Sequence, residues 1–395
     1  MKRVVSSRIR AGFAGVVMLG LVFVMAATAA AEPPRKIVVF EETFVNQPAQ
    51  LTLLANFGAT IIKPLPLING AAVYLPPQAE RALLRVRRNI GVLRIDDDLI
   101  INATGKPRPP QPAEEIPWGI QRINAGSAWS VTEGPAVKVA VLDTGIDLDH
   151  PDLKDNIKGQ VNAISPRKSG NDDNGHGTHV AGTIAAVNND IGVVGVGPQI
   201  WLYAVKVLDR SGSGWLSDII EGLDWCINNK IQVVNMSLGA PSDNLSFHTA
   251  IISAYNAGIV LVAAAGNNGP YGGVDYPGKY METIAVSAVG QDSAENLYLA
   301  SFSSTGPEVD LAAPGVNIKS TYNDGYYKLL NGTSMATPHV TGAAALVIST
   351  PYDPNGNGVW EPHEVVGKLK ATAENLGLPS YQQGAGLVSI DLAIQ

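Results

Sequence analysis

Three short segments decide the fold of this chain: VLDTG at residues 141–145, HGTHVAG at 176–182 and GTSMA at 332–336. They supply a carboxylate at Asp143, an imidazole at His176 and a hydroxyl at Ser334, in that order along the chain. A serine hydroxyl is a weak nucleophile at neutral pH and needs a base to take its proton, which an imidazole held by a carboxylate can do. The segments therefore predict a catalytic triad for nucleophilic attack.

The three segments differ in specificity when each is taken alone. Turns such as DTG are common at strand ends and GTS is moderately specific, whereas HGTHVAG is highly specific. Together, in the order Asp, His, Ser, they resemble the subtilisin family of serine endopeptidases. The resemblance covers the chain from about residue 116 to the C-terminus, with a further match upstream to the propeptide of that family.

The resemblance implies a role for each catalytic group. His176 would take the proton from Ser334 and later return it to the leaving amine, while Asp143 would orient the imidazole. Ser334 precedes a helical run at 335–348, so its N–H would face the forming oxyanion. The side chain of Asn267, in AAGN at 264–267, would be the second oxyanion donor.

The resemblance also implies a substrate cleft built from strand edges. SGSG at 211–214 and SLG at 237–239 match segments that pair with an extended peptide, and such main-chain pairing favours broad specificity. Leu216 and Ile219 would line the pocket for the fourth residue before the cut. The substrate-binding residues implied are Gly212, Ser213, Gly214, Leu216, Ser237, Leu238, Gly239 and Asp275.

Asp275 carries a prediction about specificity. It precedes YPGKY at 276–280, which resembles the segment beside the S1 pocket, and it stands where the family often has glycine. A carboxylate at the pocket floor could pair with Lys or Arg at P1. A solvated aspartate is the alternative.

Apolar runs alternate with helical stretches through the larger part of the chain. Runs rich in Val, Ile and Ala are typical of parallel strands buried on both faces. We expect an α/β fold: a subtilisin-like open, mostly parallel sheet with helices on both faces, preceded by a small ferredoxin-like α+β propeptide domain. The strands expected in the sheet are 137–142, 202–207, 231–236, 258–264 and 284–288.

The first 112 residues predict processing segments. Four basic residues precede an apolar run at about 11–25 and small residues follow it, which indicates a secretory signal at 1–31. An uncleaved membrane anchor is the alternative, although the run is short for a span. Residues 32–101 have the β-α-β-β-α-β order and resemble an inhibitory propeptide; the alternative is an unrelated small domain. Residues 102–112 have the composition of a linker and would contain the maturation cut, leaving a peptidase domain at 113–395.

Charge and cysteine content exclude some functions. Residues 1–31 carry a net charge of +4, residues 32–112 carry +3 and residues 113–395 carry −14. An acidic body argues against nucleic acid as a partner. Cys226 is the only cysteine, so no intramolecular disulfide can form, and its helical context predicts a buried small apolar residue rather than a nucleophile.

The other histidines predict little chemistry. His176 and His179 stand three apart, a spacing that can bind zinc, but no third ligand follows and no glutamate lies between them. We expect His179 and His339 to be structural. His150, His248 and His363 are expected at the surface, with no role.

Two loops are candidates for structural Ca²⁺, which prefers oxygen ligands. The first rests on resemblance to the high-affinity site of subtilisins, with Glu114 standing where the family usually has glutamine. Its expected ligands are the side chains of Glu114, Asp152 and Asn189 and the carbonyls of Val187, Ile191 and Val193.

The second loop, at 353–364, follows from the sequence itself. It fits the pattern D-x-[DN]-x-[DN]-G-x₅-E and lies between two helical stretches. A polar turn without an ion is the alternative. The expected ligands are Asp353, Asn355, Asn357, the Val359 carbonyl and Glu364.

These observations predict a secreted, calcium-stabilised serine endopeptidase of broad specificity. We expect a monomer that acts on proteins or peptides and has no stable membrane association. Its propeptide would inhibit it until self-cleavage and would assist folding, because parallel sheets with distant strands fold slowly. A narrow processing protease is the alternative, although the short connections favour degradation. An inactive homologue acting as a binding module would have lost Asp143, His176, Asn267 or Ser334, and the chain has all four.

Overall fold

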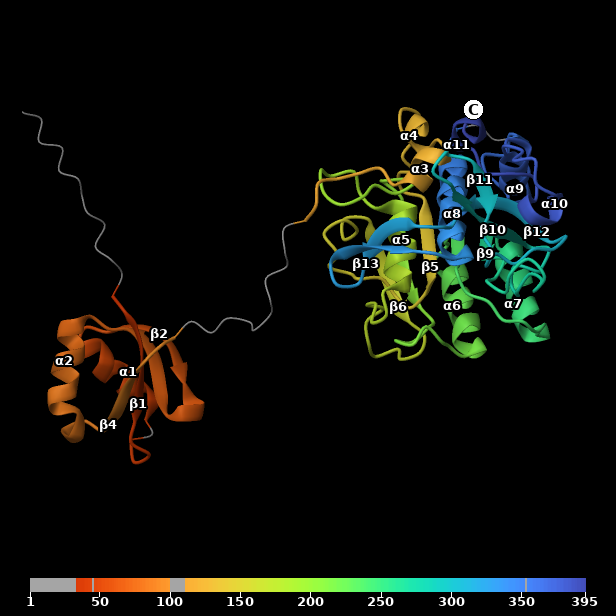
Figure 1. Cartoon of the computed structure of the whole chain (residues 1–395). Helices are drawn as coiled ribbons and strands as arrows, with labels where there is room; N and C mark the ends of the chain where they lie inside the picture. The colour runs from red at the N-terminus through yellow and green to blue at the C-terminus, as the bar shows by residue number, and fades with distance from the viewer. Residues whose placement is uncertain (1–32, 45, 100–110, 352–353) are drawn as a thin grey trace, which may run out of the picture. The chain divides into compact units, whose positions relative to one another are not determined.

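The computed structural model describes residues 33–44, 46–99, 111–351 and 354–395. The expected signal segment, most of the linker and Asp353 lie outside these residues. The chain divides into two compact units, Met1–Lys106 and Pro107–Gln395 (Figure 1).

The N-terminal unit is a four-stranded antiparallel sheet with two helices, in the order that the sequence predicts. The sheet order is β2-β3-β1-β4, and Val38, Val73 and Leu83 are fully buried in its core. Its elements are β1 (Arg35–Phe40), α1 (Gln47–Asn56), β2 (Thr60–Leu65), β3 (Gly70–Tyr74), α2 (Pro77–Val86) and β4 (Val92–Asp97).

The C-terminal unit contains a mixed, mostly parallel sheet of eight strands. The order is β11-β10-β9-β8-β5-β7-β6, with β12 beside β10, and only the β10–β11 pair is antiparallel among the described strands of this sheet. The strands are β5 (Lys138–Asp143), β6 (Ile157–Asn162), β7 (Trp201–Lys206), β8 (Val233–Met236), β9 (Val260–Ala264), β10 (Thr283–Gln291), β11 (Leu297–Leu299) and β12 (Val309–Pro314). A separate hairpin pairs β13 (Ile318–Tyr322) with β14 (Tyr326–Leu330).

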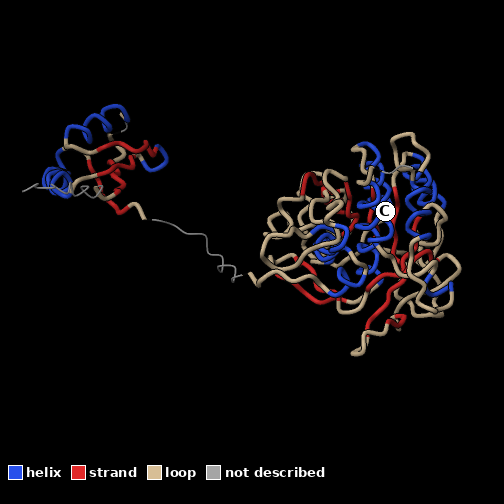
Figure 2. Tube along the Cα trace, turned by 90° about the horizontal axis from the view of Figure 1, so that it is seen from above, coloured by secondary structure: helices blue, strands red, loops and turns tan. Residues whose placement is uncertain are grey.

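Helices cover both faces of this sheet (Figures 1 and 2). α5 (His176–Ala185) and α8 (Thr333–Ile348) pack on one face, while α6 (Leu216–Asn228) and α7 (Leu245–Asn256) pack on the other. Alternate residues of β5 divide accordingly, since Val139 and Val141 join the first core and Ala140 and Leu142 the second. The remaining helices are α3 (Trp118–Arg122), α4 (Ala125–Ala128), α9 (Pro362–Ala371), α10 (Ser380–Gln383) and α11 (Ile390–Ala393).

The expected fold class is confirmed, and the differences lie at element ends. The strand expected at 231–236 begins two residues later, because Ile231 and Gln232 belong to the turn that follows α6. Ser334 lies in the first turn of α8 rather than before it. No helix in the described part of the chain is both long and apolar enough to cross a bilayer.

Candidate active site

The ends of β5 and α5 bring the acid and the base together. Asp143 is the last residue of β5 and is fully buried, and His176 is the first residue of α5. The imidazole Nδ1 lies 2.8 Å from Asp143 Oδ1 and 2.9 Å from Oδ2. Gly177 allows this approach, since a Cβ there would lie 2.2 Å from the Gly145 carbonyl oxygen. The geometry therefore matches a carboxylate that fixes the tautomer of a base.

Burial and charge act on the His176 imidazole in opposite directions. Burial lowers its pKa, but the Asp143 carboxylate raises it through charge and hydrogen bonding, and the Asp172 carboxylate adds to this. The net result is a raised pKa. A base of this kind is suited to hold a proton transiently as imidazolium.

Ser334 lies where two donors converge. Gly332, at the N-cap of α8, has φ 155°, and a Cβ built there would be 3.6 Å from the Ser334 nitrogen and 3.7 Å from Asn267 Nδ2. Asn267 Oδ1 accepts from the Thr333 N–H at 2.9 Å and from the Thr333 hydroxyl at 3.1 Å. These bonds leave Asn267 Nδ2 facing the same small space as the Ser334 N–H, which is the requirement for an oxyanion hole.

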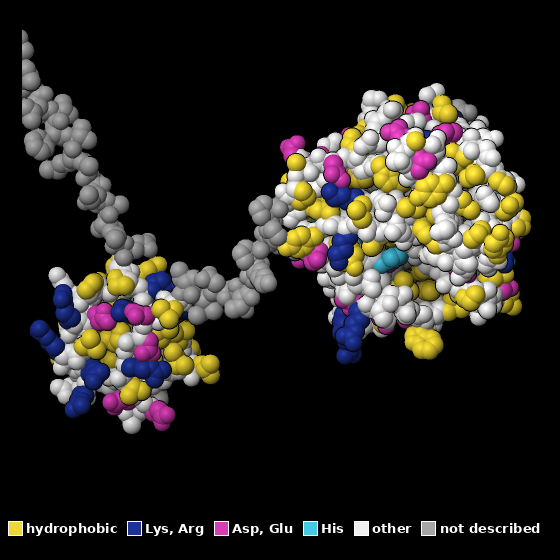
Figure 3. All heavy atoms as spheres, viewed as in Figure 1, with side chains coloured by type: hydrophobic (Ala, Val, Ile, Leu, Met, Phe, Trp, Pro, Cys, Tyr) yellow, Lys and Arg dark blue, Asp and Glu magenta, His cyan; other side chains and the backbone are white. Residues whose placement is uncertain are grey.

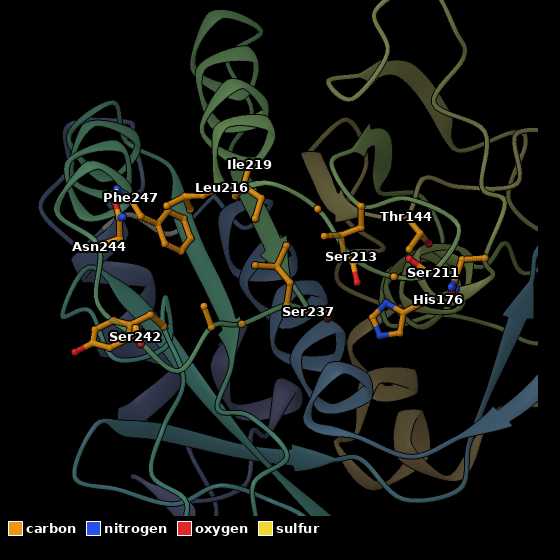
Figure 4. Close-up of a pocket in the computed structure, with 18 residues that line it drawn as sticks. Thr144, His176, Ser211, Ser213, Leu216, Ile219, Ser237, Ser242, Asn244 and Phe247 are labelled. Atoms are coloured by element: carbon orange, nitrogen blue, oxygen red, sulfur yellow. Dashed lines mark hydrogen bonds between the residues drawn. The ribbon is translucent and has the colours of Figure 1, made fainter.

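A cleft of about 600 Å³ runs past His176 (Figure 4). Ser334 reaches it through Ser237, because Ser334 Oγ donates to the Ser237 carbonyl at 3.2 Å and Ser237 Oγ donates to the Ser334 carbonyl at 2.8 Å. On the face shown in Figure 3, a histidine lies in a hollow of the C-terminal unit. The predicted residues that line the cleft are Gly212, Ser213, Gly214, Leu216, Ile219, Ser237, Leu238 and Gly239.

The cleft also contains residues that the sequence analysis missed. Leu208 and Phe247 line it, and Phe247 lies near Leu216 and Ile219 in the close-up (Figure 4). Tyr276, from the segment that the sequence places beside the S1 pocket, lines it as well. Phe247 is in the first turn of α7, which Asn244 caps by accepting from the Ser246 and Phe247 N–H groups. The N-cap asparagine is a sequence signal for this helix start, and the aromatic residue three positions later could have been placed from it.

Asp275 does not line this cleft but lies against two glycines beside it. A Cβ at Gly266 would be 2.4 Å from Asp275 Oδ2, and one at Gly239 would be 3.0 Å from Asp275 Cβ. Both carboxylate oxygens accept from Asn268 Nδ2, at 3.0 and 3.1 Å. Burial raises the pKa of Asp275, against the Asn268 bond and the charge of Lys279. The carboxylate thus has a partner within the protein.

Two histidines and the cysteine behave as the sequence predicts. His179 Nε2 lies 3.0 Å from the Ile318 carbonyl oxygen and 3.1 Å from that of Lys328, and burial lowers its pKa to about 4. His339 is buried, with Nδ1 2.9 Å from the Met335 carbonyl oxygen. Cys226 is buried as well. No cluster of three or more metal-binding His, Cys, Asp or Glu side chains occurs among the residues that the structure describes.

The expectation that His150 lies at the surface is wrong. His150 is fully buried, and its Nε2 lies 3.0 Å from the Tyr326 carbonyl oxygen. Its Nδ1 accepts from the Asp152 N–H at 3.1 Å, which places it beside the first candidate calcium loop. The turn that contains His150 looks exposed in the sequence, but strand β14, which contains Tyr326, covers it in the structure. His248 is only partly exposed, and its Nε2 pairs with Glu282 at 3.0 Å.

The first calcium loop surrounds a buried carboxylate. Asp152 is fully buried; its Oδ2 accepts from the Val193 N–H at 3.1 Å, and its Oδ1 has no hydrogen bond of standard geometry among the described residues. Burial raises the pKa of Asp152 to about 7, and the charge of Glu114 contributes. Glu114 accepts from the Asn189 N–H at 3.1 Å and the Asp190 N–H at 3.3 Å, so its side chain lies against the loop that follows α5. Tyr327 and Asn189 also interact with the Asp152 carboxylate, but burial still dominates its pKa, which fits a carboxylate that a cation would stabilise.

The second calcium loop is organised differently. Asn355 Nδ2 donates to Glu361 at 2.9 Å and to Glu364 at 2.8 Å, and Asn357 Nδ2 donates to Glu361 at 2.6 Å. Glu364 also closes a capping box with Glu361 at the start of α9. Val359 is exposed and Asp353 lies outside the described residues. The expected ligands are neighbours here, but the two amides present nitrogen rather than oxygen to the carboxylates.

Comparison with known proteins places the chain in a family. The model of the subtilase family, Peptidase_S8, matches residues 134–386. Subtilisin J of Geobacillus stearothermophilus is 41% identical over 379 residues, which are 94% of this chain and 93% of the relative. Subtilisin Savinase of Lederbergia lenta is 49% identical over 282 residues, which are 71% of this chain and 99% of the relative. The thermostable alkaline protease of Halalkalibacterium halodurans is 49% identical over 284 residues, 72% of this chain and 74% of the relative.

The fold and the site together define a hydrolase of the serine type. The chain belongs to the subtilase family and is a serine endopeptidase that hydrolyses peptide bonds. The match to subtilisin J covers 94% of the chain, so it extends into the N-terminal unit as well.

Proposed function

We propose that Asp143, His176 and Ser334 are the catalytic triad of this peptidase. The observation that carries the proposal is the Asp143–His176 pair in the wall of a cleft that Ser334 reaches through Ser237. Ser334 Oγ faces the Ser237 carbonyl in the free enzyme and turns toward His176 when substrate is bound, since catalytic hydrogen bonds commonly tighten only in the complex.

The chemistry follows from the positions of these groups. His176 Nε2 takes the Ser334 proton as Oγ attacks the scissile carbonyl, and Asp143 stabilises the imidazolium. The Ser334 N–H and Asn267 Nδ2 hold the oxyanion. The imidazolium then protonates the leaving amine, and water repeats the sequence on the acyl-enzyme to release the acid and restore Ser334.

The shape of the cleft supports extended protein substrates of varied sequence. Segments 211–214 and 237–239 form opposite walls, and backbone pairing with a peptide between them does not depend on side-chain identity. Leu216, Ile219 and Phe247 provide an apolar pocket for the P4 side chain. All four groups whose loss would mark an inactive homologue are present.

Asp275 adds a secondary preference for Lys or Arg at P1. Its carboxylate lies against Gly239 and Gly266, beside the substrate-pairing segment, and has Asn268 as a partner. A basic side chain would share that carboxylate. Asp275→Asn should lower kcat/KM for Lys substrates about 10- to 150-fold and leave Phe substrates unchanged, since one charge-assisted bond contributes about 1.5–3 kcal/mol. Equal changes for both substrates would identify Asp275 as a structural partner of Asn268.

The N-terminal segments complete the proposal. Residues 1–31 act as a secretory signal, residues 32–101 as an inhibitory propeptide and folding assistant, and the linker at 102–112 is cut by the enzyme itself to leave a monomer that begins near Ala113. The ferredoxin-like order of the N-terminal unit and the extension of the subtilisin J match into it support this. The propeptide region, 32–112, should inhibit mature enzyme in trans at micromolar concentration, more weakly at high salt because its charge of +3 opposes −14. Unchanged casein hydrolysis would overturn the assignment.

Calcium would be held by the buried Asp152 and its loop, with Glu114, Asn189 and the carbonyls of Val187, Ile191 and Val193. The ion would offset the buried negative charge and add stability without entering the chemistry. The loop at 353–364 is the second, weaker candidate.

Substitution of Ser334 tests the function as a whole. Ser334→Ala should remove casein hydrolysis and leave the precursor uncut, with a loss of about 10⁶-fold in kcat, a magnitude taken from subtilisin itself. Ser349→Ala, at the far end of the same helix, is the matched control and should mature normally. Normal turnover by the Ser334 variant would refute the triad.

A further inference from the structure

One buried carboxylate near the triad is unused by the mechanism above. Asp172 lies in the segment before α5 and is only 4% exposed. Its Oδ1 accepts from Thr144 Oγ1 at 2.9 Å, from the Asn174 N–H at 2.9 Å and from the Gly175 N–H at 3.0 Å. Its Oδ2 accepts from the Thr178 N–H at 3.0 Å and from Thr178 Oγ1 at 2.6 Å. Five donors thus converge on one side chain.

These donors come from both elements that carry the catalytic pair. Thr144 directly follows Asp143 at the end of β5, and Gly175 directly precedes His176. The Thr144 hydroxyl also accepts from the Gly177 N–H at 2.9 Å. A chain of hydrogen bonds therefore runs from the residue after His176, through the residue after Asp143, to Asp172.

Helix capping alone does not account for this arrangement. A carboxylate near a helix start is expected to accept N–H groups such as those of Gly175 and Thr178. The Thr144 hydroxyl follows β5 rather than α5, and it both donates to Asp172 and accepts from the Gly177 N–H in the first turn of α5. What the bond does is to fix the end of β5 against the first turn of α5.

We propose that Asp172 is a positioning residue of the peptidase: through Thr144 it holds Asp143 and His176 at the separation that the triad requires. The proposal rests on the triad assigned above. The Thr144 carbonyl is held independently, since Lys206 Nζ donates to it at 2.6 Å while also binding the Leu208 carbonyl and Asp173. Thr144 is therefore fixed at its backbone and at its side chain.

Asp172 also acts on His176 through its charge. The groups that face the imidazole are Asp143 on β5, Asp172 before α5 and His179 on α5 itself, and the last of these is neutral because burial lowers its pKa to about 4. Removing the Asp172 charge lowers the pKa of His176. Loss of this negative charge therefore moves the acid limb of the kcat/KM profile to lower pH.

The test compares Asp172→Asn with Asp173→Asn in mature, active-site-titrated enzyme. The two substitutions remove the same charge at adjacent positions, but Asp173 is 56% exposed and pairs with Lys206, which keeps two carbonyl acceptors without it. Asp172→Asn should lower kcat about 10- to 100-fold with KM little changed, since misplacement of a catalytic group by about 1 Å costs up to about 100-fold. Its acid limb should shift to lower pH, because the negative charge that helps to raise the pKa of His176 is gone. Asp173→Asn should stay within about twofold of wild type.

Thr144→Val separates position from charge and serves if Asp172→Asn does not mature. Valine keeps the shape but removes the bridging hydroxyl, so kcat should fall about tenfold with no shift of the acid limb. The double variant should lose less than the product of the two single losses, because both break the same bridge. The proposal fails if Thr144→Val keeps kcat within about twofold of wild type and Asp172→Asn, where it matures, does so as well. The triad would still stand, because its own test is Ser334→Ala.

Discussion

The two loops predicted to bind calcium differ in what their side chains do without an ion. Around Asp152, one carboxylate oxygen is buried and has no hydrogen bond of standard geometry, and Glu114 brings a second negative charge to the same loop. In the loop at 353–364, the carboxylates of Glu361 and Glu364 accept from Asn355 and Asn357 and cap α9. The loop around Asp152 therefore contains buried negative charge that a cation would stabilise. In the loop at 353–364, the carboxylates already accept hydrogen bonds from neighbouring side chains.

The comparison shows that a match to a calcium-binding sequence pattern is different from a buried charge that a cation would stabilise. The second loop fits its sequence pattern at every position, but such a pattern fixes residue types, not the direction of an amide. The first loop has a weaker sequence signal and a stronger physical one, because a fully buried carboxylate with no cation beside it is costly. We therefore expect calcium to stabilise the protein mainly through the first loop.

The largest effect is expected from Asp152→Asn. In millimolar calcium this variant should melt about 5–10 °C below wild type, since a ligand at a hundred times its Kd adds about 2.7 kcal/mol and 1 kcal/mol corresponds to about 2–4 °C in a large domain. In EGTA the difference in melting temperature between the variant and wild type should disappear or change sign. Wild type then keeps a buried negative charge beside Glu114 with no cation to offset it. Melting is measured on enzyme blocked by a serine-directed inhibitor, so that autolysis does not contribute.

The decisive outcome is a difference in melting temperature between wild type and Asp152→Asn that is present in calcium and is lost or reversed in EGTA. A variant that is equally destabilised in calcium and in EGTA would show that Asp152 acts through its bond to the Val193 N–H alone. Initial kcat should be unchanged in both conditions, because the loop does not line the cleft among the residues described.

A smaller effect is expected from Glu114→Gln. Glutamine keeps an oxygen for the ion but removes one charge, and ligand charge tunes calcium affinity. The calcium Kd should rise about tenfold, which is about 1.4 kcal/mol and lowers the melting temperature by about 3–6 °C when calcium is well above both Kd values. Glu115→Gln is the matched control, since Glu115 is 52% exposed, pairs with Lys319 and is not among the expected ligands. Equal shifts in calcium affinity for both variants would mean that Glu114 contributes only to general charge.

How far the sequence predicted the molecule depended on the range of the interactions involved. The strands are set by local apolar runs, and the fold predicted from them is confirmed. Asp143, His176 and Ser334 are each set by a local motif, and their role as a triad stays a prediction. Leu208 and Phe247 meet in the cleft only because two distant segments are brought together by the sheet. The burial of His150 depends on the strand at Tyr326, far along the chain, and no local pattern around His150 contains that information.

The smallest effect is expected from Glu364→Gln in the second loop. Glutamine preserves the capping box, because its oxygen can still accept the Glu361 N–H that Glu364 now accepts at 3.0 Å. The substitution therefore removes a charged ligand while keeping the helix start.

For calcium to bind, Asn355 and Asn357 must turn their amide oxygens inward and give up their bonds to the carboxylates, and this cost makes the site weak. At millimolar calcium the variant should bind one ion fewer and melt about 1–4 °C lower, with kcat unchanged, since the site contributes about 0.5–1 kcal/mol. In EGTA the difference should be smaller, because only the loss of the Asn355 Nδ2 bond to Glu364 then separates the two proteins. A drop of equal size in EGTA, or calorimetry showing the same number of ions in both proteins, would reduce residues 353–364 to a polar turn whose carboxylates serve α9 alone.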